Sequence, residues 1–408
     1  MSAIAFDIPE DIRAVRDGLL GFLDKEVIAR HEAKADLLGD PRRKFAEDGR
    51  MSAAAWDEVV AVRKAAAEAG FFSMSVPEEM GGAGLGSLAY YVCWQSLFRH
   101  CGPQNWLAVF AISHWAFGPS AVLRDLTPEA RERILAPLMR GEQSMCFGLS
   151  EPGAGSDASM IATRAVLDGD GWRLSGRKIW TTNSPHAEYC IVFAVTEPER
   201  SPRGISAFLV PTESPGFEIE SIIRMQGSIG GDEAQLLLED VRVEPWQLVG
   251  RLHDGFKTAL LGVSLGRVYN SARAVGLARW ATEMAWSYSQ TRTAFGKSIA
   301  SYQGVTFPLA ESAMELHAAH LMGLNASLLL DKGELAVKEL SMAKAYSVEI
   351  GARAIDRAIQ THGAMGFTNE LGLYDAYNIV RLVNVADGTN EILRRTIAQR
   401  MLKGDVDL

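Results

Sequence analysis

Apolar residues recur at helical intervals in the first part of the chain. The segment 53–72 shows this spacing, and Gly70 ends it, which predicts an amphipathic helix. A second helix is predicted within 126–139, because Thr127 can cap its start and Pro128 suits its first position. We therefore expect an N-terminal helical domain.

The pattern changes to short apolar runs, separated by turn residues, between residues 145 and 249. The segment 163–180 is predicted to form two strands joined at 168–171, because the sequence Asp-Gly-Asp-Gly favours a tight hairpin turn. Further apolar runs follow at close spacing over 189–196, 204–211 and 234–243. This pattern predicts a small β-sandwich or barrel.

Long helical periods return after Gly255. Four such segments, joined by short links, are 260–291, 306–330, 337–363 and 390–402. Four helices with short connections favour an antiparallel bundle. The expected fold class is α+β, mainly α. Its expected domains are an N-terminal helical domain over 1–144, a central β-domain over 145–249 and a C-terminal four-helix domain over 250–408.

Two glycine-rich stretches, 81–87 and 151–157, do not predict a phosphate-binding loop. Neither ends in the Gly-Lys-Ser/Thr of a P-loop. Neither has the spacing of a dinucleotide-binding turn, and the segregation of helices from strands along the chain argues against that fold. Taken alone, each stretch predicts a tight turn.

The formal net charge of −9 disfavours a protein that binds nucleic acid broadly, since such a surface is basic. It is compatible with an anionic small ligand, because a few placed arginines suffice for one. No apolar run approaches the ~20 residues of a membrane span. The N-terminus lacks the pattern of a secretory signal, and the C-terminus is not a peroxisomal tripeptide.

The four cysteines are scattered and form no CxxC pair, which is typical of a reduced, cytoplasmic protein with buried thiols. No metal site is expected. His317 and His320 share a helical face, but the sequence offers no third ligand nearby.

Four motifs occur in order along the chain, within 148–183, 292–303, 360–367 and 386–394. They include GLSEPGAGSD, KIWTTN, RTAFGK, QTHGAMGF and ADGTNEIL, and together they closely resemble the acyl-CoA dehydrogenase family of flavoproteins. The resemblance covers nearly the whole chain. It implies a helical domain, a central β-domain and a four-helix domain. It also implies non-covalent FAD and a homotetramer, with a homodimer as the alternative.

The resemblance places one group of residues around the flavin ring. Leu149 and Ser150 match positions that contact the ring, and Ser keeps the hydroxyl of the more usual Thr. Trp180 matches a residue that flanks the ring, and Thr182 matches one whose hydroxyl points toward flavin N5. Such donors favour the negative charge that develops as a hydride arrives. Ser156 matches a residue near both the flavin and the CoA portion of the substrate.

A second group matches residues that contact the rest of FAD or the substrate. Arg292 and Phe295 match contacts to the pyrophosphate and adenosine, and a guanidinium suits phosphate oxygens because it binds them as a fork. Arg267 matches an arginine on the helix lining the substrate site, where it would position the base or the CoA. The other implied FAD contacts are Gln303, Gln360, Gly363, Thr389 and Glu391, the first three largely across a subunit boundary.

Asp387 matches the catalytic base, where most members have Glu. Removing a weakly acidic α-proton requires a carboxylate in a dry pocket. Asp is shorter by one methylene, which reduces the reach by roughly 1.5 Å. A second family position for the base, the residue before Arg267, is Gly266, which cannot serve. The alternative role for Asp387 is a structural acid at a helix start, which Thr389 or Asn390 could also cap.

The resemblance implies an enzyme of fatty acid or acyl-CoA catabolism that dehydrogenates an acyl-CoA at its α,β-bond. Asp387 would take the α-proton, flavin N5 would take the β-hydride, and electrons would pass to an electron-transfer flavoprotein. Alternatives with the same fold are an acyl-CoA oxidase and a flavin monooxygenase-like enzyme that uses oxygen. A DNA-protective relative has a basic surface, so the acidic balance disfavours that function.

Overall fold

The computed structural model describes residues 7–200, 204–225 and 227–407. The chain forms two compact units, each discontinuous in sequence. Unit 1 is built from Met1–Ile28, Leu85–Ala108 and Ser264–Leu408, and unit 2 from Ala29–Gly84 and Val109–Val263. The predicted division into domains over 1–144, 145–249 and 250–408 stays a prediction.

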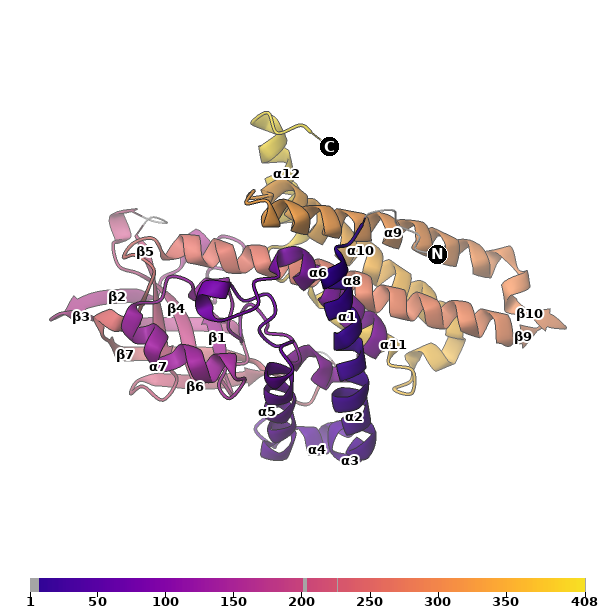
Figure 1. Ribbon diagram of the computed structural model, residues 1–408, viewed down its shortest axis with the longest axis horizontal. Helices are drawn as coiled ribbons and strands as arrows, with labels where there is room; N and C mark the ends of the chain where they lie inside the picture. The colour runs from indigo at the N-terminus through magenta and orange to yellow at the C-terminus, as the bar shows by residue number, and fades with distance from the viewer. Residues whose placement is uncertain (1–6, 201–203, 226, 408) are drawn as a thin grey trace. The chain divides into compact units, whose positions relative to one another are not determined.

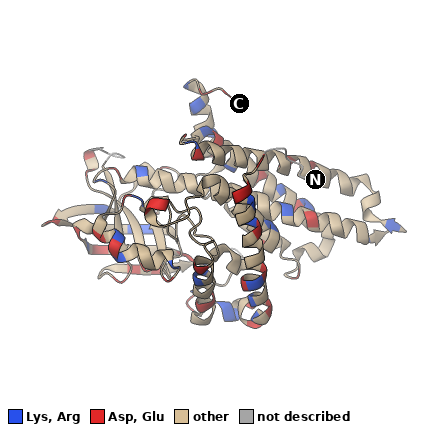
Figure 2. Cartoon of the chain, in the orientation of Figure 1, with Lys and Arg blue, Asp and Glu red and all other residues tan. Residues whose placement is uncertain are grey.

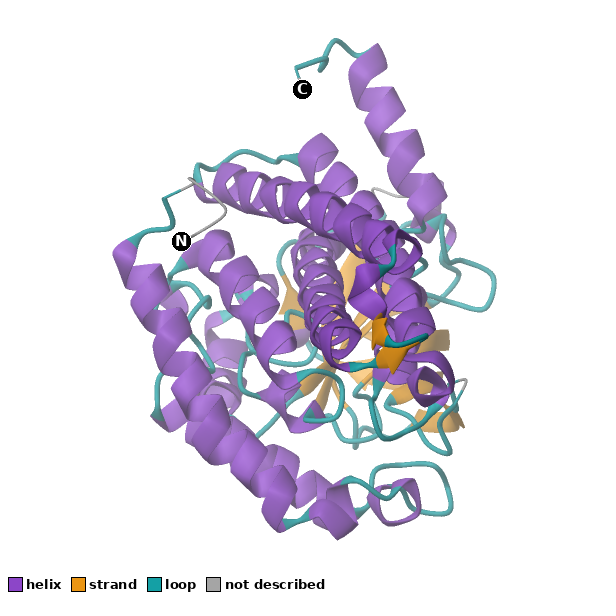
Figure 3. Ribbon diagram, turned by 90° about the vertical axis from the view of Figure 1, so that its right-hand side faces the viewer, coloured by secondary structure: helices purple, strands orange, loops and turns teal. Residues whose placement is uncertain are grey.

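Unit 1 is helical apart from one short β-hairpin. Its long helices have nearly the limits that the apolar period predicts, and α11 is an additional helix that the sequence analysis did not predict. The elements, coloured by type in Figure 3, are α1 (Glu10–Phe22), α6 (Gly86–Cys101), α8 (Gly255–Thr291, which begins in unit 2), β9 (Thr293–Ala294), β10 (Lys297–Ser298), α9 (Gln303–Asp331), α10 (Val337–His362), α11 (Leu373–Leu382) and α12 (Asn390–Leu402).

Helix α10 is the centre of unit 1, and it packs against α9, α11 and α12. Its buried face is rich in small residues, which allow helices to approach closely. At Gly351 even a Cβ would come within 3.2 Å of the Ala274 carbonyl oxygen of α8. Figure 1 shows α8, α9 and α10 lying side by side, so the segments predicted to form the bundle do pack together.

The start of α6 is fixed by the last residue of α9. The Asp331 carboxylate accepts hydrogen bonds from the Ser87 N–H at 2.6 Å and the Leu88 N–H at 2.9 Å. A negative group at these unpaired N–H groups stabilises a helix start. Gly86 has φ +80°, and a Cβ there would lie 2.6 Å from Asp331 Oδ1. Part of the glycine-rich stretch 81–87 therefore serves helix docking.

Unit 2 holds the sheet and the short N-terminal helices. The helices are α2 (Ala29–Ala33), α3 (Ala35–Leu38), α4 (Pro41–Lys44), α5 (Ala53–Glu68) and α7 (Pro128–Met139). The predicted cap of α7 is confirmed, because Thr127 Oγ1 accepts from the Ala130 N–H at 3.1 Å. The strands are β1 (Met145–Gly148), β2 (Arg164–Asp168), β3 (Gly171–Thr182), β4 (Tyr189–Val195), β5 (Ile205–Pro211), β6 (Phe217–Ile223), β7 (Glu233–Val243) and β8 (Leu248–Val249).

The strands form one sheet in the order β6-β7-β3-β2-β4-β5-β8, with β1 added beside β4. Its two antiparallel halves meet at a single register pair, Arg164 with Val195, between parallel β2 and β4. Both halves share one buried cluster, which includes Leu174 and Leu236 from one half and Val192 and Phe208 from the other. Among the described strands the order does not close into a barrel, so the barrel alternative is wrong.

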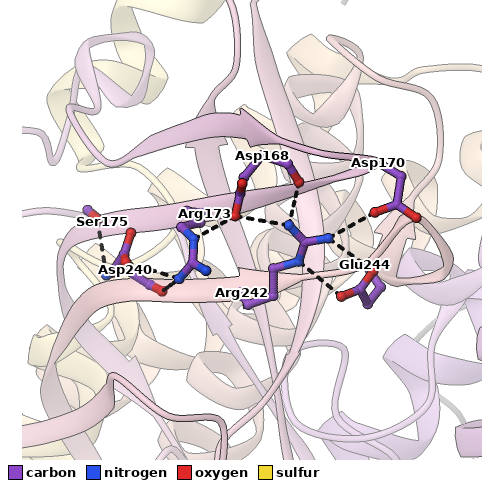
Figure 4. A network of polar contacts seen from close by, with 7 residues as sticks. All are labelled: Asp168, Asp170, Arg173, Ser175, Asp240, Arg242 and Glu244. Atoms are coloured by element: carbon purple, nitrogen blue, oxygen red, sulfur yellow. Dashed lines mark hydrogen bonds and ion pairs between the residues drawn. The ribbon is translucent and has the colours of Figure 1, made fainter.

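The predicted hairpin at 168–171 is confirmed. β2 and β3 pair from Arg164–Ser175 to Asp168–Gly171, and β3 continues onto β7. Figure 4 shows an ion network over this corner, in which Arg173 contacts Asp168 at 2.7 Å and Asp240 at 3.0 Å. Arg242 contacts Asp168, Asp170 and Glu244 at 2.9–3.1 Å. Because these groups are largely exposed, the network adds little stability.

Acidic and basic residues are interspersed along the elements of both units in Figure 2. No described helix has the length and apolar character needed to cross a bilayer. The described residues also contain no group of three His, Cys, Asp or Glu side chains placed to hold a metal ion.

A buried ion pair ties the loop after β1 to β3. The Lys178 ammonium lies 2.7 Å from Glu151 Oε1 and also donates to the carbonyls of Phe193 at 2.6 Å and Leu149 at 3.3 Å. Glu151 accepts in turn from the N–H of Thr163 at 3.0 Å. Neither charged side chain is exposed beyond 7%. Each charge therefore depends on the other, because an isolated buried charge is costly.

We expect Lys178→Met to destabilise the protein by about 3–5 kcal/mol, because Glu151 would then be buried without a cation. Its neighbour Arg177 offers a matched control, since it forms a more exposed pair with Glu220 at 3.3 Å. Arg177→Met should cost about 1 kcal/mol or less. Urea denaturation of both variants measures this difference in the free energy of unfolding. Equal losses of stability would show that the buried pair contributes no more than the exposed one.

Candidate active site

The loop between α11 and α12 holds Asp387 in a backbone conformation that side chains rarely adopt. Its φ is +52°, in the left-handed region that costs a non-glycine residue about 1–2 kcal/mol. α12 begins at Asn390, and Thr389 caps it, because Thr389 Oγ1 accepts from the Ile392 N–H at 3.3 Å. The Asp387 side chain is therefore not used as the cap, and a strained residue of this kind often marks a functional site.

The Asp387 carboxylate lies against one face of α8. Its Oδ2 accepts a hydrogen bond from Asn270 Nδ2 at 2.7 Å. Gly266 lies one turn earlier on the same face, and a Cβ at that position would lie 2.2 Å from Oδ2. The carboxylate can take this position only because residue 266 has no side chain.

Burial raises the pKa of Asp387 from 3.8 to about 6. The cations Lys344, Arg267 and Arg273 and the hydrogen bond from Asn270 act in the opposite direction and favour the charged form. At pH 7 the group is therefore mostly a carboxylate, yet it is a stronger base than an exposed aspartate. This is the combination that general-base catalysis near neutral pH requires.

Lys344 of α10 supports the same loop by donating hydrogen bonds from its ammonium to the Gly388 carbonyl at 2.9 Å and to Asn390 Oδ1 at 3.3 Å. The side chain is fully buried, and burial lowers the pKa of Lys344 to about 8, although the charge of Asp387 acts to raise it. Asn390 is tied down further by its amide, which donates to Glu349 Oε1 at 3.1 Å. The loop that carries Asp387 is thus held to α10 by polar contacts.

Arg267 contacts the main chain of the candidate base. Its Nε lies 3.4 Å from the Asp387 carbonyl oxygen, a long hydrogen bond. Burial lowers the pKa of Arg267, and the nearby Asp387 charge opposes this shift. The structure therefore brings the two predicted residues Asp387 and Arg267 together and links Arg267 to the loop.

In unit 2, the predicted flavin contacts gather at the end of β3. The Ser150 carbonyl accepts from the Ile179 N–H at 2.9 Å, so the Leu149–Ser150 segment lies beside β3. Trp180 follows at an irregularity in the β3–β7 register, with φ +60° and 54% of its surface exposed. Thr182 is two residues farther and pairs with Glu233. A bulge of this kind re-aims a side chain, and here it presents an indole to solvent.

Ser156 is not part of β3 or of the segment paired with it. It lies in the exposed loop between β1 and β2. This loop begins at Glu151, which the buried Lys178 holds in place. Its position next to an anchored segment is consistent with a ligand-binding loop on a rigid scaffold.

In unit 1, Arg292 and Phe295 lie at the β9–β10 hairpin. Phe295 has φ +51° and is 96% exposed, although a bulky apolar side chain normally avoids both conditions. Arg292 is exposed, and it forms no ion pair within the described chain. An exposed guanidinium and an exposed ring at the same hairpin suit a ligand that combines phosphate with an aromatic base.

The remaining predicted contacts are on helix ends of unit 1. Gln303 begins α9, Gln360 lies in the last turn of α10, and Gly363 follows it with φ +60°. All three are exposed, as is Glu391 in the first turn of α12. No described residue comes within 4 Å of a Cβ placed on Gly363. Their exposure leaves them available for a ligand or a second subunit.

Two residues of the site, Asn270 and Lys344, were missed by the sequence analysis. Asn270 follows Gly266 by four residues, so helical geometry alone would have placed both on one face. Lys344 interrupts an apolar face of α10 between Leu340 and Val348. A lysine at such a position is a signal of a buried functional or structural charge.

Three family models match consecutive parts of the chain. The acyl-CoA dehydrogenase N-terminal domain matches residues 9–142, the middle domain residues 146–241 and the C-terminal domain residues 253–402. Together they cover most of the sequence.

Individual relatives are similar over most of their length. The mitochondrial short-chain specific acyl-CoA dehydrogenase of Homo sapiens is 35% identical over 335 residues, covering 82% of this chain and 80% of the relative. The CarC subunit of the caffeyl-CoA reductase-Etf complex of Acetobacterium woodii is 33% identical over 337 residues, covering 83% and 88%. The structure of an acyl-CoA dehydrogenase from Geobacillus kaustophilus aligns with a TM-score of 0.84 at 26% identity, covering 98% and 100%.

We expect Gly266→Ala to displace the Asp387 carboxylate, because the new methyl group would occupy the place of Oδ2. The lost Asn270 hydrogen bond should reduce stability by about 1–3 kcal/mol. Gly21 of α1 is a matched control, since a Cβ there meets nothing within 4 Å. Gly21→Ala should stabilise by about 0.5–1 kcal/mol. Urea denaturation compares the two, and a gain of stability in both variants would contradict the tight contact at Gly266.

Proposed function

Because the chain belongs to the acyl-CoA dehydrogenase family, we propose that Asp387 is the base that removes the α-proton of an acyl-CoA thioester. The protein is an oxidoreductase that acts on a CH–CH group. Its cofactor is FAD, which supplies the acceptor for the β-hydride when bound. The observation that carries the proposal for Asp387 is its buried carboxylate with a pKa of about 6, placed against Gly266.

The residues that would hold FAD fit its chemistry. The exposed Trp180 indole and the Thr182 hydroxyl, beside Leu149 and Ser150, offer a flat apolar surface and polar groups for a ring system. The unpaired Arg292 suits a pyrophosphate. The other residues proposed for FAD are Phe295, Gln303, Gln360, Gly363, Thr389 and Glu391, and Ser156 is proposed for the substrate side.

Asp387 would act by accepting the α-proton on its carboxylate while the site excludes water. Exclusion of water makes the carboxylate a stronger base. It also strengthens the hydrogen bonds that the site donates to the thioester oxygen. The Asp387 backbone N–H is our candidate donor to that oxygen. Arg267 would hold the carbonyl of Asp387 and so fix the orientation of the peptide group between Asp387 and Gly388.

This chain has Asp where most of the family has Glu, and the local structure offers a compensation for the shorter side chain. The left-handed backbone at Asp387 and the missing Cβ at Gly266 let the loop approach α8 directly. We propose that the loop, rather than a longer side chain, supplies the missing reach. The second family position for the base is Gly266 itself, so it cannot take over the role.

The substrate is proposed to be an acyl-CoA and the electron partner an electron-transfer flavoprotein. The support is the similarity to a short-chain specific dehydrogenase and to a reductase subunit from an Etf complex. The similarity to the reductase subunit also favours an alternative in which the same site reduces an α,β-unsaturated acyl-CoA. Asp387 would then return a proton to the α-carbon, as microscopic reversibility requires.

We also propose assembly into a homotetramer, with a homodimer as the alternative. Unit 1 exposes the large apolar side chains Phe295, Phe307, Met314 and Phe367. In the proposed assembly a second subunit would cover some of these side chains. Cytoplasmic localisation stays a prediction from cysteine usage.

We expect Asp387→Asn to slow flavin bleaching by a saturated acyl-CoA by about 10²–10⁴-fold, because the amide cannot accept the α-proton. For the native protein, kcat/KM should rise about tenfold per pH unit up to a pH of about 6 and then level off, since only the ionised carboxylate is active. Anaerobic stopped-flow absorbance with a panel of acyl-CoAs measures both.

Asp387→Glu is the control for this experiment, because it keeps a carboxylate and should retain more activity than Asp387→Asn. Bleaching by Asp387→Asn at the native rate would refute the assignment of the base. Rapid turnover with oxygen alone, producing peroxide, would instead favour the oxidase alternative.

A further inference from the structure

One amide side chain fixes the carboxylate of the candidate base. Asn270 is buried at 2% exposure, and its Nδ2 donates to Asp387 Oδ2 at 2.7 Å. Among the described residues it makes the single hydrogen bond to this carboxylate, and Oδ1 accepts none. A charge-assisted bond in such surroundings is short and strong.

The orientation of the Asn270 amide is determined by its other contact. Arg273, three residues later on α8, donates from its guanidinium to Asn270 Oδ1 at 3.1 Å. A guanidinium can only donate, so the amide oxygen must face Arg273 and the amide NH₂ must face Asp387. Arg273 is itself placed over the Tyr269 ring, 4.9 Å from its centroid. The donor is therefore fixed before a substrate arrives.

We propose that Asn270 is a positioning residue that directs the proton transfer: it holds Asp387 Oδ2 against α8 and leaves Oδ1 as the oxygen that takes the α-proton. The proposal rests on the proposed function of Asp387 and adds the residue that sets its geometry. In the step, the Cα–H bond breaks and an O–H bond forms at Oδ1. The electron pair of the C–H bond stays on the thioester.

The contacts explain why such a residue is needed here. Asp387 has two side-chain torsions, and residue 266 has no Cβ that would restrict rotation of the carboxylate against α8. The Asn270 bond removes this freedom, and a misplacement of about 1 Å can cost about a hundredfold in rate. The same bond favours the ionised form, so it also counteracts the effect of burial.

The test compares Asn270→Leu, which is similar in size but cannot donate, with native holoenzyme. The readout is the rate of deuterium uptake at the α-carbon of 3,3-dimethylbutyryl-CoA. This thioester has α-hydrogens but no β-hydrogen, so it reports proton transfer without flavin reduction. We expect a loss on the order of a hundredfold and an upward shift of the pH midpoint by roughly one unit, with the KM for acyl-CoA little changed.

Thr282→Val is the matched control, because it removes another buried polar group of α8, a hydroxyl that donates to the Ala278 carbonyl at 2.7 Å and has no contact with Asp387 among the described residues. It should leave the exchange rate and the pH midpoint unchanged. Asn270→Ala provides a smaller variant without a donor if the leucine is not tolerated, and thermal melting verifies that each variant is folded. A folded Asn270 variant with the native pH midpoint and exchange rate overturns the positioning role.

The outcomes also separate this inference from the function on which it rests. If the native protein neither exchanges the α-proton nor bleaches with any acyl-CoA, the proposed function fails. If the native protein does both and the Asn270 variants match it, only the positioning role fails. A loss confined to KM would equally overturn it, because that result assigns Asn270 to substrate binding.

Discussion

The contact between the Asp387 carboxylate and the face of α8 at Gly266 and Asn270 is the constraint on which the site depends. A buried carboxylate is costly unless hydrogen bonds and nearby cations compensate it. Here one amide supplies the bond at 2.7 Å, and the absence of a side chain at residue 266 supplies the space. The loop must therefore approach α8 closely, and the positive φ of Asp387 is the local cost of that approach.

The supporting elements of unit 1 follow from this requirement. Lys344 reaches the loop from α10 and bonds the Gly388 carbonyl, so the helix at the centre of the bundle also anchors the site. The charges of Lys344 and Arg267 limit how far burial can raise the pKa of Asp387, which keeps it near the value a base needs. In unit 2 the pair Lys178–Glu151 has a comparable role, because it fixes the segment that contains Leu149 and Ser150.

Much of the fold could be predicted from the sequence because long helical segments, joined by short links, follow a region of short strands separated by turn residues. α8, α9, α10 and α12 lie within a few residues of their predicted limits, and the hairpin at 168–171 forms where two Asp-Gly pairs predict it. α11 was missed because it is short, although its sequence is amphipathic. The choice between sandwich and barrel could not be made, since pairing of distant strands is not encoded locally. The motif residues of the candidate site could be listed from sequence, but Asn270 and Lys344 could not be linked to them.

The sequence by itself determined the order of helical and strand segments, the family to which the chain is similar, and the presence of an aspartate, Asp387, within the last of the four motifs. Only the tertiary structure decided the environment of that acid. Asn270 and Asp387 are 117 residues apart in the sequence, and only the packing of the helices brings them into contact. The pKa of a carboxyl group depends on burial and on the charges that packing brings near it. The chemistry of Asp387 is therefore a property of the assembled bundle, because no local pattern specifies which distant side chains will surround it.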